Sequence, residues 1–360
     1  MTMRAVVMQE GQLSVSHVAI PQPGPGEVLV RTLACGICGS DLHCAKHGQH
    51  LLQAAFEATG QRLFDYHQPV VMGHEICAEV VEHGAGCSRA LAAGARVVSA
   101  PFLLRQQPVT LGFGGIDTPG GYAEYMVLTE ALLLPVPDGI PNDVATLTEP
   151  LAVALHAVNR GAVGSRDVPI VIGCGPIGLA VIAVLRMRGI GPIVAADFSP
   201  TRRAMARALG ADVVVDPRDT SPFDSWKSMA AATAPSDFGR QTAMFPGYAF
   251  RPAVVFECVG SPGVVQQILA GAPPSSKVVV AGVCMETDSY KPTFAIMKEI
   301  DLAFCMAFTP DEYAEAFSLL ATEQIRLDSL ITGHVGIEGV QGAFDRLASP
   351  EQDTKIIIVP

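Results

Sequence analysis

The run Val168–Leu185 constrains the fold of this chain more than any other segment. It holds 18 residues without a charge, which is the length at which a membrane span becomes a candidate. Gly173, Gly175, Pro176 and Gly178 interrupt it, so the run predicts a buried strand, a tight turn and a buried helix instead. A strand that leads into a helix in this way begins a parallel βαβ unit.

The glycine spacing of this turn predicts a dinucleotide-binding site. Such a site requires the order strand, G-x-G-x-x-G and helix, and the residues from Gly173 to Gly178 supply it. Gly173 permits a sharp turn, Gly175 lets a pyrophosphate approach the backbone, and Gly178 lets the helix pack against the strand. Pro176 and Ile177 begin the helix, whose free N–H groups and dipole would hold the pyrophosphate.

The end of the next strand indicates which dinucleotide binds. Asp197 stands there, 19 residues after Gly178, where a carboxylate accepts hydrogen bonds from the ribose hydroxyls and repels a 2′-phosphate. We therefore expect NAD rather than NADP. Arg202 and Arg203 follow. Either they lie in a solvent-exposed first turn of a helix, or their side chains could contact the 2′-phosphate of NADP. Two further expected cofactor contacts are Gly282 and Val283.

The two halves of the chain differ in the order and spacing of their predicted strands and helices, which predicts an α/β protein of two domains. Short apolar runs between proline- and glycine-rich turns are typical of an antiparallel barrel-like domain, and they occupy 5–8, 28–32, 76–82, 96–99 and 123–128. From about Leu151, strands alternate with helices as in a doubly wound parallel sheet, with strands expected at 168–172, 193–196, 213–215, 253–256, 278–281 and 302–306. One helix is expected at 200–209, with Ser199 and Gly210 as its caps. A helix at 311–321 and a strand at 355–359 would return to the first domain.

Two stretches, 47–68 and 217–252, lack a clear periodic pattern. The first is polar and aromatic, and the second contains the only tryptophan, Trp226. We expect both to be ordered insertions, and long ordered loops are often functional. A surface elaboration or a subunit contact is the other interpretation.

Cysteine and histidine residues in the first half predict a metal site. Cys35 and Cys38 are spaced as C-x-x-C, and the dipeptide His74-Glu75 follows. No second C-x-x-C occurs and no thioredoxin-like pattern surrounds the pair, which disfavours a zinc knuckle and a redox pair. A catalytic zinc takes three protein ligands and keeps one open position. Cys38, His74 and one carboxylate, from Glu75 or Glu149, would supply the three.

In these motifs the chain resembles the zinc-containing medium-chain dehydrogenase/reductase superfamily over nearly its whole length. Glu149-Pro150-Leu151 is similar to the polyol, sorbitol and butanediol dehydrogenase branch, where a glutamate stands in place of the third cysteine ligand of other alcohol dehydrogenases. The segments that carry the resemblance occur in the family's order and are 23–30, 35–43, 73–75, 119–125, 149–156 and 173–178.

The resemblance implies a fold and a metal content. The fold comprises a GroES-like catalytic domain at 1–152 and 309–360 and a Rossmann NAD-binding domain at 153–308. One catalytic zinc ion per chain is implied. Members with a structural zinc carry four clustered cysteines after a G-D-R-V segment. The matching segment here is Gly94–Val97, and no cysteine follows it until Cys174, so we expect that lobe to be absent or free of metal.

The resemblance also implies roles for the residues around the zinc. Cys38 and His74 match zinc ligands. Glu75 matches a glutamate that binds zinc in some members and lies behind it in others. Glu149 matches a ligand or a group that holds zinc-bound water.

Four further positions match functional residues of the family. Ser40 matches the hydroxyl beside the substrate oxygen, and His43 matches the histidine that completes the proton path to solvent. Local turn hydrogen bonds are the other interpretation of both. Asp197 and Arg202 match residues that contact the adenosine ribose.

These residues predict a zinc-dependent oxidoreductase. It would transfer hydride between a secondary alcohol or polyol and NAD, giving a ketone or aldehyde and NADH. One alternative is a zinc-free quinone or enoyl-type reductase of the same superfamily, whose members lack the cysteine and Gly-His-Glu signatures. A second alternative is a non-catalytic nucleotide-binding protein on the same fold.

Composition and charge limit the partners. Hydrophobic residues make up 49% and charged residues 16% of the chain, which excludes disorder. The net charge of −11, without a basic stripe, argues against nucleic acid and membrane partners. The nine cysteines are scattered and the N-terminus lacks the apolar region of a signal peptide, so we expect a cytoplasmic protein. We also expect a small alcohol or ketone substrate and a homodimer or homotetramer.

Overall fold

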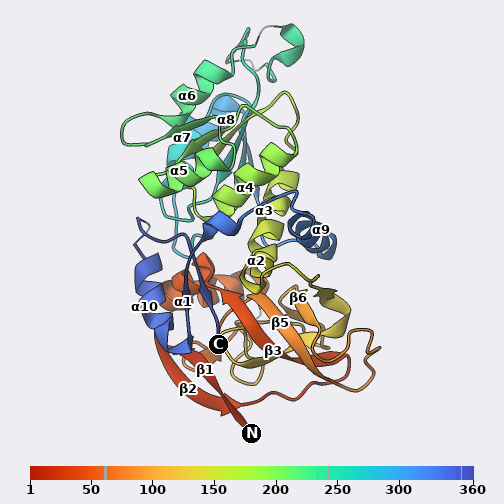
Figure 1. The fold of residues 1–360 in the computed structure, drawn as a ribbon. Coiled ribbons are helices and arrows are strands. Elements are labelled where there is room, and N and C mark those ends of the chain that lie inside the picture. The colour runs from red at the N-terminus through yellow and green to blue at the C-terminus, as the bar shows by residue number, and fades with distance from the viewer. Residues whose placement is uncertain (61–62, 233, 242–243, 350) are drawn as a thin grey trace. The chain divides into compact units, whose positions relative to one another are not determined.

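The computed structural model describes residues 1–60, 63–232, 234–241, 244–349 and 351–360. They form two compact units, of which the first comprises Met1–Glu149 and Tyr313–Pro360, and the second Pro150–Glu312. The first unit therefore joins the red end of the chain in Figure 1 to its blue end.

Strand β3 (Glu27–Gly36) organises the first unit. It pairs antiparallel with β5 (Glu75–His83), β9 (Tyr125–Thr129) and β18 (Lys355–Ile358). Most of its residues are buried on both faces, because partners surround a strand whose sequence is rich in valine and leucine. The remaining strands of this sheet are β6 (Arg96–Ser99), β10 (Leu133–Pro135) and β17 (Ile331–Val335).

Two smaller strand groups complete the first unit. β1 (Thr2–Gln9) pairs with β2 (Gln12–Ala19) and with β4 (Val70–Val71). β7 (Phe102–Leu103) pairs with β8 (Val109–Thr110). Almost every pairing in this unit is antiparallel; the exception among the described strands is β17 with β18. The prediction of a barrel-like β-rich domain is confirmed.

Short and long helices connect these strands. α3 (Thr148–Gly161) and α9 (Pro310–Ala321) each contain a boundary between the two units. The helices within the first unit are α1 (Gly39–Thr59), η1 (Glu130–Leu132), α2 (Asn142–Thr146), η3 (Asp328–Leu330), η4 (Ile337–Gly339) and α10 (Val340–Leu347).

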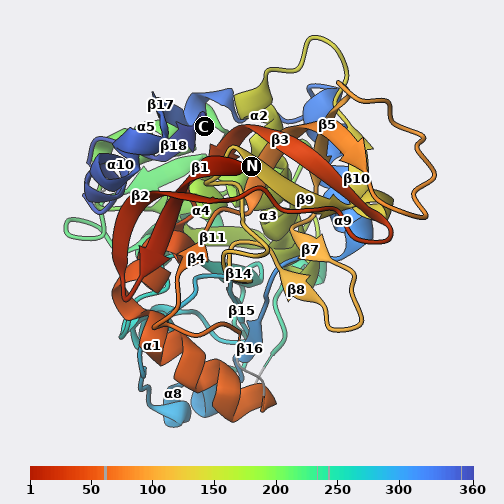
Figure 2. The same cartoon turned by 90° about the horizontal axis from the view of Figure 1, so that it is seen from below.

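The first insertion is more regular than its sequence suggested. α1 continues as far as Thr59 and is seen as a long orange helix in Figure 2. Only His47, with φ −128°, departs from helical geometry inside it. Residues 47–59 are ordered, as expected, and they are helical although they lack a clear apolar period, because leucine, glutamine, alanine and glutamate in this stretch favour a helix. Gly60 ends the helix with φ +71°, and residues 61–62 lie outside the described residues.

The second unit contains a parallel sheet in the order β13-β12-β11-β14-β15-β16. The strands are β11 (Val168–Ile172), β12 (Val194–Ala196), β13 (Val213–Val215), β14 (Ala253–Glu257), β15 (Lys277–Val280) and β16 (Asp301–Phe304). Its helices are α4 (Pro176–Met187), α5 (Pro200–Ala208), α6 (Pro222–Met229), η2 (Pro235–Asp237), α7 (Val264–Gly271) and α8 (Pro292–Lys298). This sheet confirms the predicted doubly wound domain.

The core of this unit explains part of the second insertion. Trp226 on α6 is 2% exposed and belongs to one buried cluster with residues of β11 and β14. Its ring centroid lies 5.8 Å from that of Phe250. The described part of 217–252 therefore contributes to the core as well as to the surface, while residues 233 and 242–243 of it lie outside the described residues.

The run that opened the sequence analysis forms β11, a glycine turn and α4, as predicted. In the described part of the chain, no helix combines the length and apolar character needed to cross a membrane. Ser199 caps α5 by accepting a hydrogen bond from the Arg202 N–H at 3.3 Å. The C-cap is Leu209 rather than Gly210, which follows with φ +108°.

Candidate functional site

The cysteine motif lies where β3 ends and α1 begins. Cys38 occupies the N-cap position of α1. Its backbone N–H donates to Asp41 Oδ2 at 3.0 Å, and the Tyr122 hydroxyl donates to the same oxygen at 2.6 Å. Asp41 is fully buried, and burial raises the pKa of its carboxyl. The turn is thus fixed by a buried acid that holds the Cys38 backbone.

His74 is held beside this turn. Gly73 precedes it with φ +98°, and a Cβ there would meet the Tyr122 ring at 2.5 Å. His74 Nδ1 lies 3.5 Å from Asp41 Oδ1, and His74 Nε2 lies 3.5 Å from Ser40 Oγ. Burial by itself lowers the pKa of His74, but the charges of Asp41 and Cys38 raise it well above its ordinary value. The imidazole therefore lies in a buried, negatively charged environment that would suit a cation.

Glu75 has a different partner. Lys355 Nζ donates to its two carboxylate oxygens at 2.6 and 2.7 Å, and also to the Ile37 carbonyl at 2.9 Å. Lys355 and Glu75 are both almost completely buried. Burial is the largest single effect and lowers the pKa of Lys355, but the charges of Glu75, Cys38 and Glu149 and the hydrogen bond to Glu75 together raise it above its ordinary value. Glu75 is therefore already neutralised by an ammonium group.

Glu149 lies in the first turn of α3, 8% exposed. Burial raises the pKa of its carboxyl to about 7, the charge of His74 opposes this rise, and the charge of Glu75 adds to it. The charge of Lys355 also opposes the rise, but no hydrogen bond joins Lys355 to Glu149 among the described contacts. A buried carboxyl near a buried imidazole has the character expected of a ligand to a metal cation.

The donor types present fit zinc. A thiol, an imidazole and a carboxylate are the ligands that Zn²⁺ takes in catalytic sites, and Cys38, His74 and Glu149 supply one of each. The structure brings Cys38 against His74. It does not bring three ligand atoms of the predicted set within 4.8 Å of one another; in the described residues only the set His83, Cys87 and Glu130 is that close.

The two predicted relay residues lie on α1. Ser40 is half-buried beside His74, and His43 is half-buried one turn further along the helix. Their spacing of three residues places them on one side of the helix.

No sequence motif assigns a role to three buried residues of the site. They are Asp41, whose Oδ1 lies 3.5 Å from His74 Nδ1; Tyr122, which donates to Asp41; and Lys355, which neutralises Glu75. Asp41 lies between Cys38 and His43 in the sequence, so its position in the cysteine motif is a signal that could have indicated a role. Lys355 is 280 residues from its partner, and only its place at the start of an apolar strand distinguishes it.

The dinucleotide motif has the geometry that its glycines predict. Gly173 adopts φ +91°, and a Cβ on it would meet Val259 at 2.7 Å. Around Gly175, the N-cap of α4, a Cβ would meet no atom within 4 Å, which leaves room for a ligand. A Cβ on Gly178 would collide with the Gly173 carbonyl. Pro176 and Ile177 form the first turn of α4.

Asp197 connects this turn to the next strand. Its Oδ2 accepts from the Cys174 N–H and its Oδ1 from the Ser199 N–H, each at 2.7 Å. Each carboxylate oxygen accepts more than one hydrogen bond, so the carboxylate retains capacity for ribose hydroxyls. Arg202 is half-buried in the first turn of α5, and burial lowers the pKa of its guanidinium.

Two further arginines converge beside Asp197. Arg203 donates to the carbonyls of Asp197 and Phe198 and to Asp216 at 2.8–2.9 Å. Arg218 donates to Asp216 as well, and this hydrogen bond holds the pKa of that carboxyl well below its usual range. Asp216 therefore neutralises part of the positive charge next to the expected ribose position.

The last two predicted cofactor contacts follow β15. A Cβ on Gly282 would meet Glu257 Oε2 at 2.6 Å, so this backbone approaches β14 closely. Val283 is 48% exposed. Glu257 is buried, and its Oε1 accepts from the N–H groups of Val259 and Gly260 at 2.7 and 2.9 Å.

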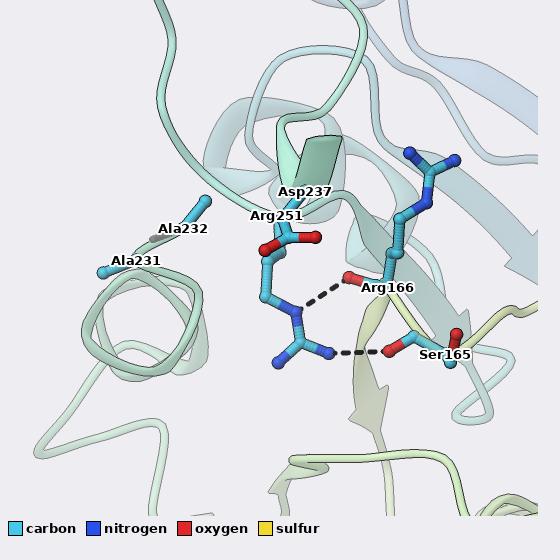
Figure 3. A pocket seen from close by; sticks show the side chains of 6 residues that line it. All are labelled: Ser165, Arg166, Ala231, Ala232, Asp237 and Arg251. Atoms are coloured by element: carbon cyan, nitrogen blue, oxygen red, sulfur yellow. Dashed lines mark hydrogen bonds between the residues drawn. The ribbon is translucent and has the colours of Figure 1, made fainter. Parts of the chain in front are cut away.

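A pocket of about 430 Å³ in the second unit contains none of the predicted residues. Figure 3 shows that Arg251 crosses it and donates to the carbonyls of Arg166 and Ser165, at 2.8 and 3.1 Å. Main-chain carbonyls already use this guanidinium, and the charged side chains of Arg166 and Asp237 also line the pocket.

Comparisons with known proteins agree with the two units. Residues 24–138 match the family model of the alcohol dehydrogenase GroES-like domain, and residues 176–322 match that of the zinc-binding dehydrogenases. (R,R)-butanediol dehydrogenase from Bacillus subtilis (strain 168) is 30% identical over 359 residues, covering 97% of this chain and 96% of the relative. Sorbitol dehydrogenase from Gallus gallus is 28% identical, covering 94% and 91%.

A solved structure gives the same result. It is that of a protein from Sinorhizobium meliloti 1021, described as a zinc-binding dehydrogenase, with NADP bound. It is 27% identical to this chain, covers both chains completely and has a TM-score of 0.78. The chain is an oxidoreductase that belongs, as its motifs predicted, to the zinc-containing medium-chain dehydrogenase/reductase superfamily, in the alcohol and polyol dehydrogenase branch, with zinc and a nicotinamide dinucleotide as cofactors.

Proposed function

We propose that this protein oxidises a secondary alcohol or polyol with NAD, using one catalytic zinc held by Cys38, His74 and Glu149. The observation that supports the proposal is that Glu75 and Glu149 differ in their contacts with Lys355. Lys355 donates directly to both oxygens of Glu75 at 2.6–2.7 Å. Glu149 is buried near His74 and feels the charge of Lys355, but Lys355 makes no hydrogen bond to it among the described contacts. Of the two candidates for the third ligand, the pairing favours Glu149.

Cys38, His74 and Glu149 would hold a zinc ion, which would supply Lewis-acid chemistry towards the alcohol oxygen. Asp41 Oδ1 lies 3.5 Å from His74 Nδ1, so we propose that Nε2 would be the nitrogen that binds the metal, with a carboxylate behind the imidazole as in many ligand histidines. Ser40, which lies beside His74, would accept the proton of the alcohol and pass it to His43 and then to solvent. The alternative proton path runs through Glu149 and water.

The products follow from the balance of the reaction. The carbon that bears the hydroxyl loses a hydride to C4 of the nicotinamide, so a secondary alcohol and NAD⁺ give a ketone, NADH and one proton. Gly173, Gly175 and Gly178 would hold the pyrophosphate, and Asp197 the adenosine ribose. We propose NAD over NADP because the carboxylate of Asp197 would repel a 2′-phosphate.

The relatives support the substrate class. Their names give butanediol and sorbitol as substrates, which share a secondary alcohol next to a second hydroxyl group. We propose vicinal diols and polyols first. We propose other secondary alcohols, including cyclic ones, as the next class to test. The insertion that α1 enters contains aromatic residues, which would favour a bulkier or less polar substrate.

A substrate panel tests the function. Zinc-replete enzyme is mixed with NAD and with secondary alcohols, vicinal diols, polyols and cyclic alcohols, and NADH absorbance is followed. At least one class should be oxidised, and a chelator should abolish the activity until zinc is restored. Cys38→Ser should lose both zinc and activity, whereas Cys44→Ser, which changes a cysteine of the same helix, should keep them.

Two results would contradict the proposal in different ways. Reduction of quinones or enones that survives removal of zinc would favour the zinc-free reductase. Tight binding of NAD without turnover of any alcohol would favour the non-catalytic nucleotide-binding protein.

We also propose that the catalytic domain comprises 1–152 and 309–360 and the NAD-binding domain 153–308. A homodimer or homotetramer is supported by the exposed edge strand β16, in which Phe304 is 61% exposed. A cytoplasmic location is supported by nine free cysteines, since reducing compartments keep thiols reduced.

A further inference from the structure

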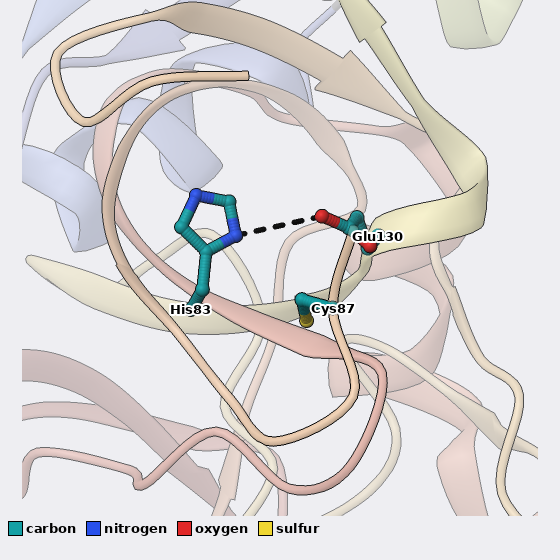
Figure 4. Close-up of side chains that lie close together, drawn as sticks. All are labelled: His83, Cys87 and Glu130. Atoms are coloured by element: carbon teal, nitrogen blue, oxygen red, sulfur yellow. Dashed lines mark ion pairs between the residues drawn. The ribbon is translucent and has the colours of Figure 1, made fainter. Parts of the chain in front are cut away.

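A second set of metal-ligand side chains lies in the first unit, among residues that the proposed reaction does not use. His83 ends β5, Cys87 lies in the turn that follows, and Glu130 begins η1 (Figure 4). One ligand atom from each lies within 4.8 Å of the other two. Among the described residues, no other three histidine, cysteine or acidic side chains come together in this way.

His83 presents a lone pair to the other two residues. Its Nε2 lies 2.9 Å from the Leu91 carbonyl; because a carbonyl only accepts, Nε2 carries the proton. In the neutral ring Nδ1 is therefore unprotonated. Nδ1 is buried, has no hydrogen-bond partner among the described residues, and lies 3.5 Å from Glu130 Oε1. Two acceptors that face each other at this distance require a proton or a cation between them.

Glu130 is fixed and ionised. The N–H groups of Ser88 and Arg89 donate to its two oxygens at 2.6 and 2.8 Å. The Ser88 hydrogen bond is the chief cause that lowers the pKa of Glu130. Each oxygen keeps a further lone pair, so the carboxylate can bind a cation without losing these contacts.

Cys87 supplies the third donor. Its thiol donates to the Glu27 carbonyl at 3.2 Å. Burial raises the pKa of Cys87, so without a metal it is a thiol. A bound zinc-type ion displaces the thiol proton to solvent and forms a metal–sulfur bond in its place.

The turn that carries Cys87 is fixed before any ion binds. A Cβ on Gly84 would collide with the Gly24 carbonyl. The Gly84 N–H donates to the Glu27 carbonyl, and the Gly26 N–H donates to the Ala85 carbonyl, each at 2.8 Å. The ligand atoms are thus presented by a rigid backbone, which lowers the cost of forming a site.

We propose that His83, Cys87 and Glu130 form a second binding site for a divalent ion of the zinc type. One nitrogen, one sulfur and one oxygen donor are the set that zinc accepts, and zinc–ligand bond lengths place ligand atoms roughly 3.3–3.7 Å apart in a tetrahedron. The nitrogen and oxygen already satisfy this distance. The site is half-exposed, so water takes the fourth position and the ion exchanges more readily than the catalytic zinc.

Cobalt is the probe that tests this site. Full-length enzyme that retains its catalytic zinc is titrated with Co²⁺, and thiolate-to-cobalt charge-transfer absorption is recorded. The wild type should bind one Co²⁺ per chain with this absorption. Cys87→Ser, which keeps a hydroxyl donor for the Glu27 carbonyl, should lose the band, and Glu130→Gln should bind about tenfold more weakly or worse.

Two matched controls lie in the same unit and are exposed, Glu82→Gln and His17→Ala; both should bind cobalt as the wild type does. NADH formation should be unchanged in every variant, and the Tm without cobalt should be unchanged in Cys87→Ser and in both controls, which shows that the fold is intact. The proposal is overturned if the zinc-replete wild type gives no charge-transfer band. It is also overturned if the band persists in Cys87→Ser and the affinity is unchanged in Glu130→Gln.

Discussion

Single residues decide which charges in this protein are available for binding. Lys355 pairs with the carboxylate of Glu75, and the buried carboxyl of Asp41 lies 3.5 Å from His74 Nδ1. In the second unit, Asp216 has the same kind of effect, because it engages Arg203 and Arg218 beside the expected ribose position. Each of these charged contacts involves a candidate zinc ligand or lies beside the expected position of the cofactor ribose.

Asp216 gives a prediction about cofactor choice. Asp216→Asn removes the carboxylate that engages both arginines, so a guanidinium becomes available to a 2′-phosphate. The ratio of kcat/KM for NADP to that for NAD should rise about tenfold, which corresponds to one charge-assisted hydrogen bond. Asp219→Asn, an exposed neighbour, should leave the ratio unchanged. An unchanged ratio in Asp216→Asn would show that Asp197 alone sets the preference.

His43 gives a prediction about the proton path. If His43 receives the proton from Ser40, then His43→Ala should lower kcat/KM for alcohol oxidation by about a hundredfold near neutral pH. Higher pH and buffer bases should restore part of the loss, and the zinc content should not change. His50→Ala, an exposed histidine of the same helix, is the control. Little effect of His43→Ala together with a large effect of Glu149→Gln would assign the path to Glu149 and water.

At the scale of elements, the last strand is part of the catalytic unit. β18 pairs with β3 and carries Lys355, while β5 carries Glu75. One buried ion pair therefore connects the C-terminal strand to the strand beside the metal ligands. The cost of breaking such a pair is large because the remaining charge stays buried.

Removal of the ammonium group measures this connection. Lys355→Met should lower the free energy of unfolding by about 3–5 kcal/mol, as measured by denaturant titration. The double variant Lys355→Met with Glu75→Gln should recover part of the loss, because no unpaired charge remains. Lys46→Met, an exposed lysine, should change the value by less than about 0.5 kcal/mol. If Lys355→Met changed the free energy of unfolding by no more than the control Lys46→Met does, the buried pair would contribute nothing to stability.

At the scale of the whole molecule, the second unit ends in an unprotected sheet edge. β16 is the last strand of the parallel sheet. Residues near it in the chain are apolar and exposed, including Ile296 at 73%, Phe304 at 61% and Met306 at 88%. Uncovered edges with apolar side chains are sites of association, so we expect a second copy of the chain to cover this one.

Mass measurement by light scattering tests the association. The wild type should have two or four times the mass of the 37.8 kDa chain. Phe304→Asp should reduce the mass to that of a single chain, because a buried unpaired charge disfavours the contact. Leu104→Asp, at a residue of the first unit that is 60% exposed, should keep the assembly. A wild type with the mass of one chain would contradict the expectation.

The sequence by itself determined the features that depend on local pattern. Residues 168–172 and 213–215 form strands with the predicted bounds, since apolar periodicity and flanking turns act over a few residues. The glycine motif and the Cys-x-x-Cys segment identified the family, because their chemistry requires fixed spacing. The helix at 47–59 was missed, since its side chains are mostly exposed and give no apolar stripe.

Only the tertiary structure decided which charged groups meet. Lys355 and Glu75 are 280 residues apart, and His83 and Glu130 come from different elements of the sheet. No local pattern encodes such pairs, because they depend on strand order and register. The sequence left Glu75 and Glu149 as equal candidates for the third zinc ligand. Folding gives the two carboxylates different surroundings, since it buries an ammonium group against Glu75 and places the buried carboxyl of Glu149 where the charge of His74 acts on it.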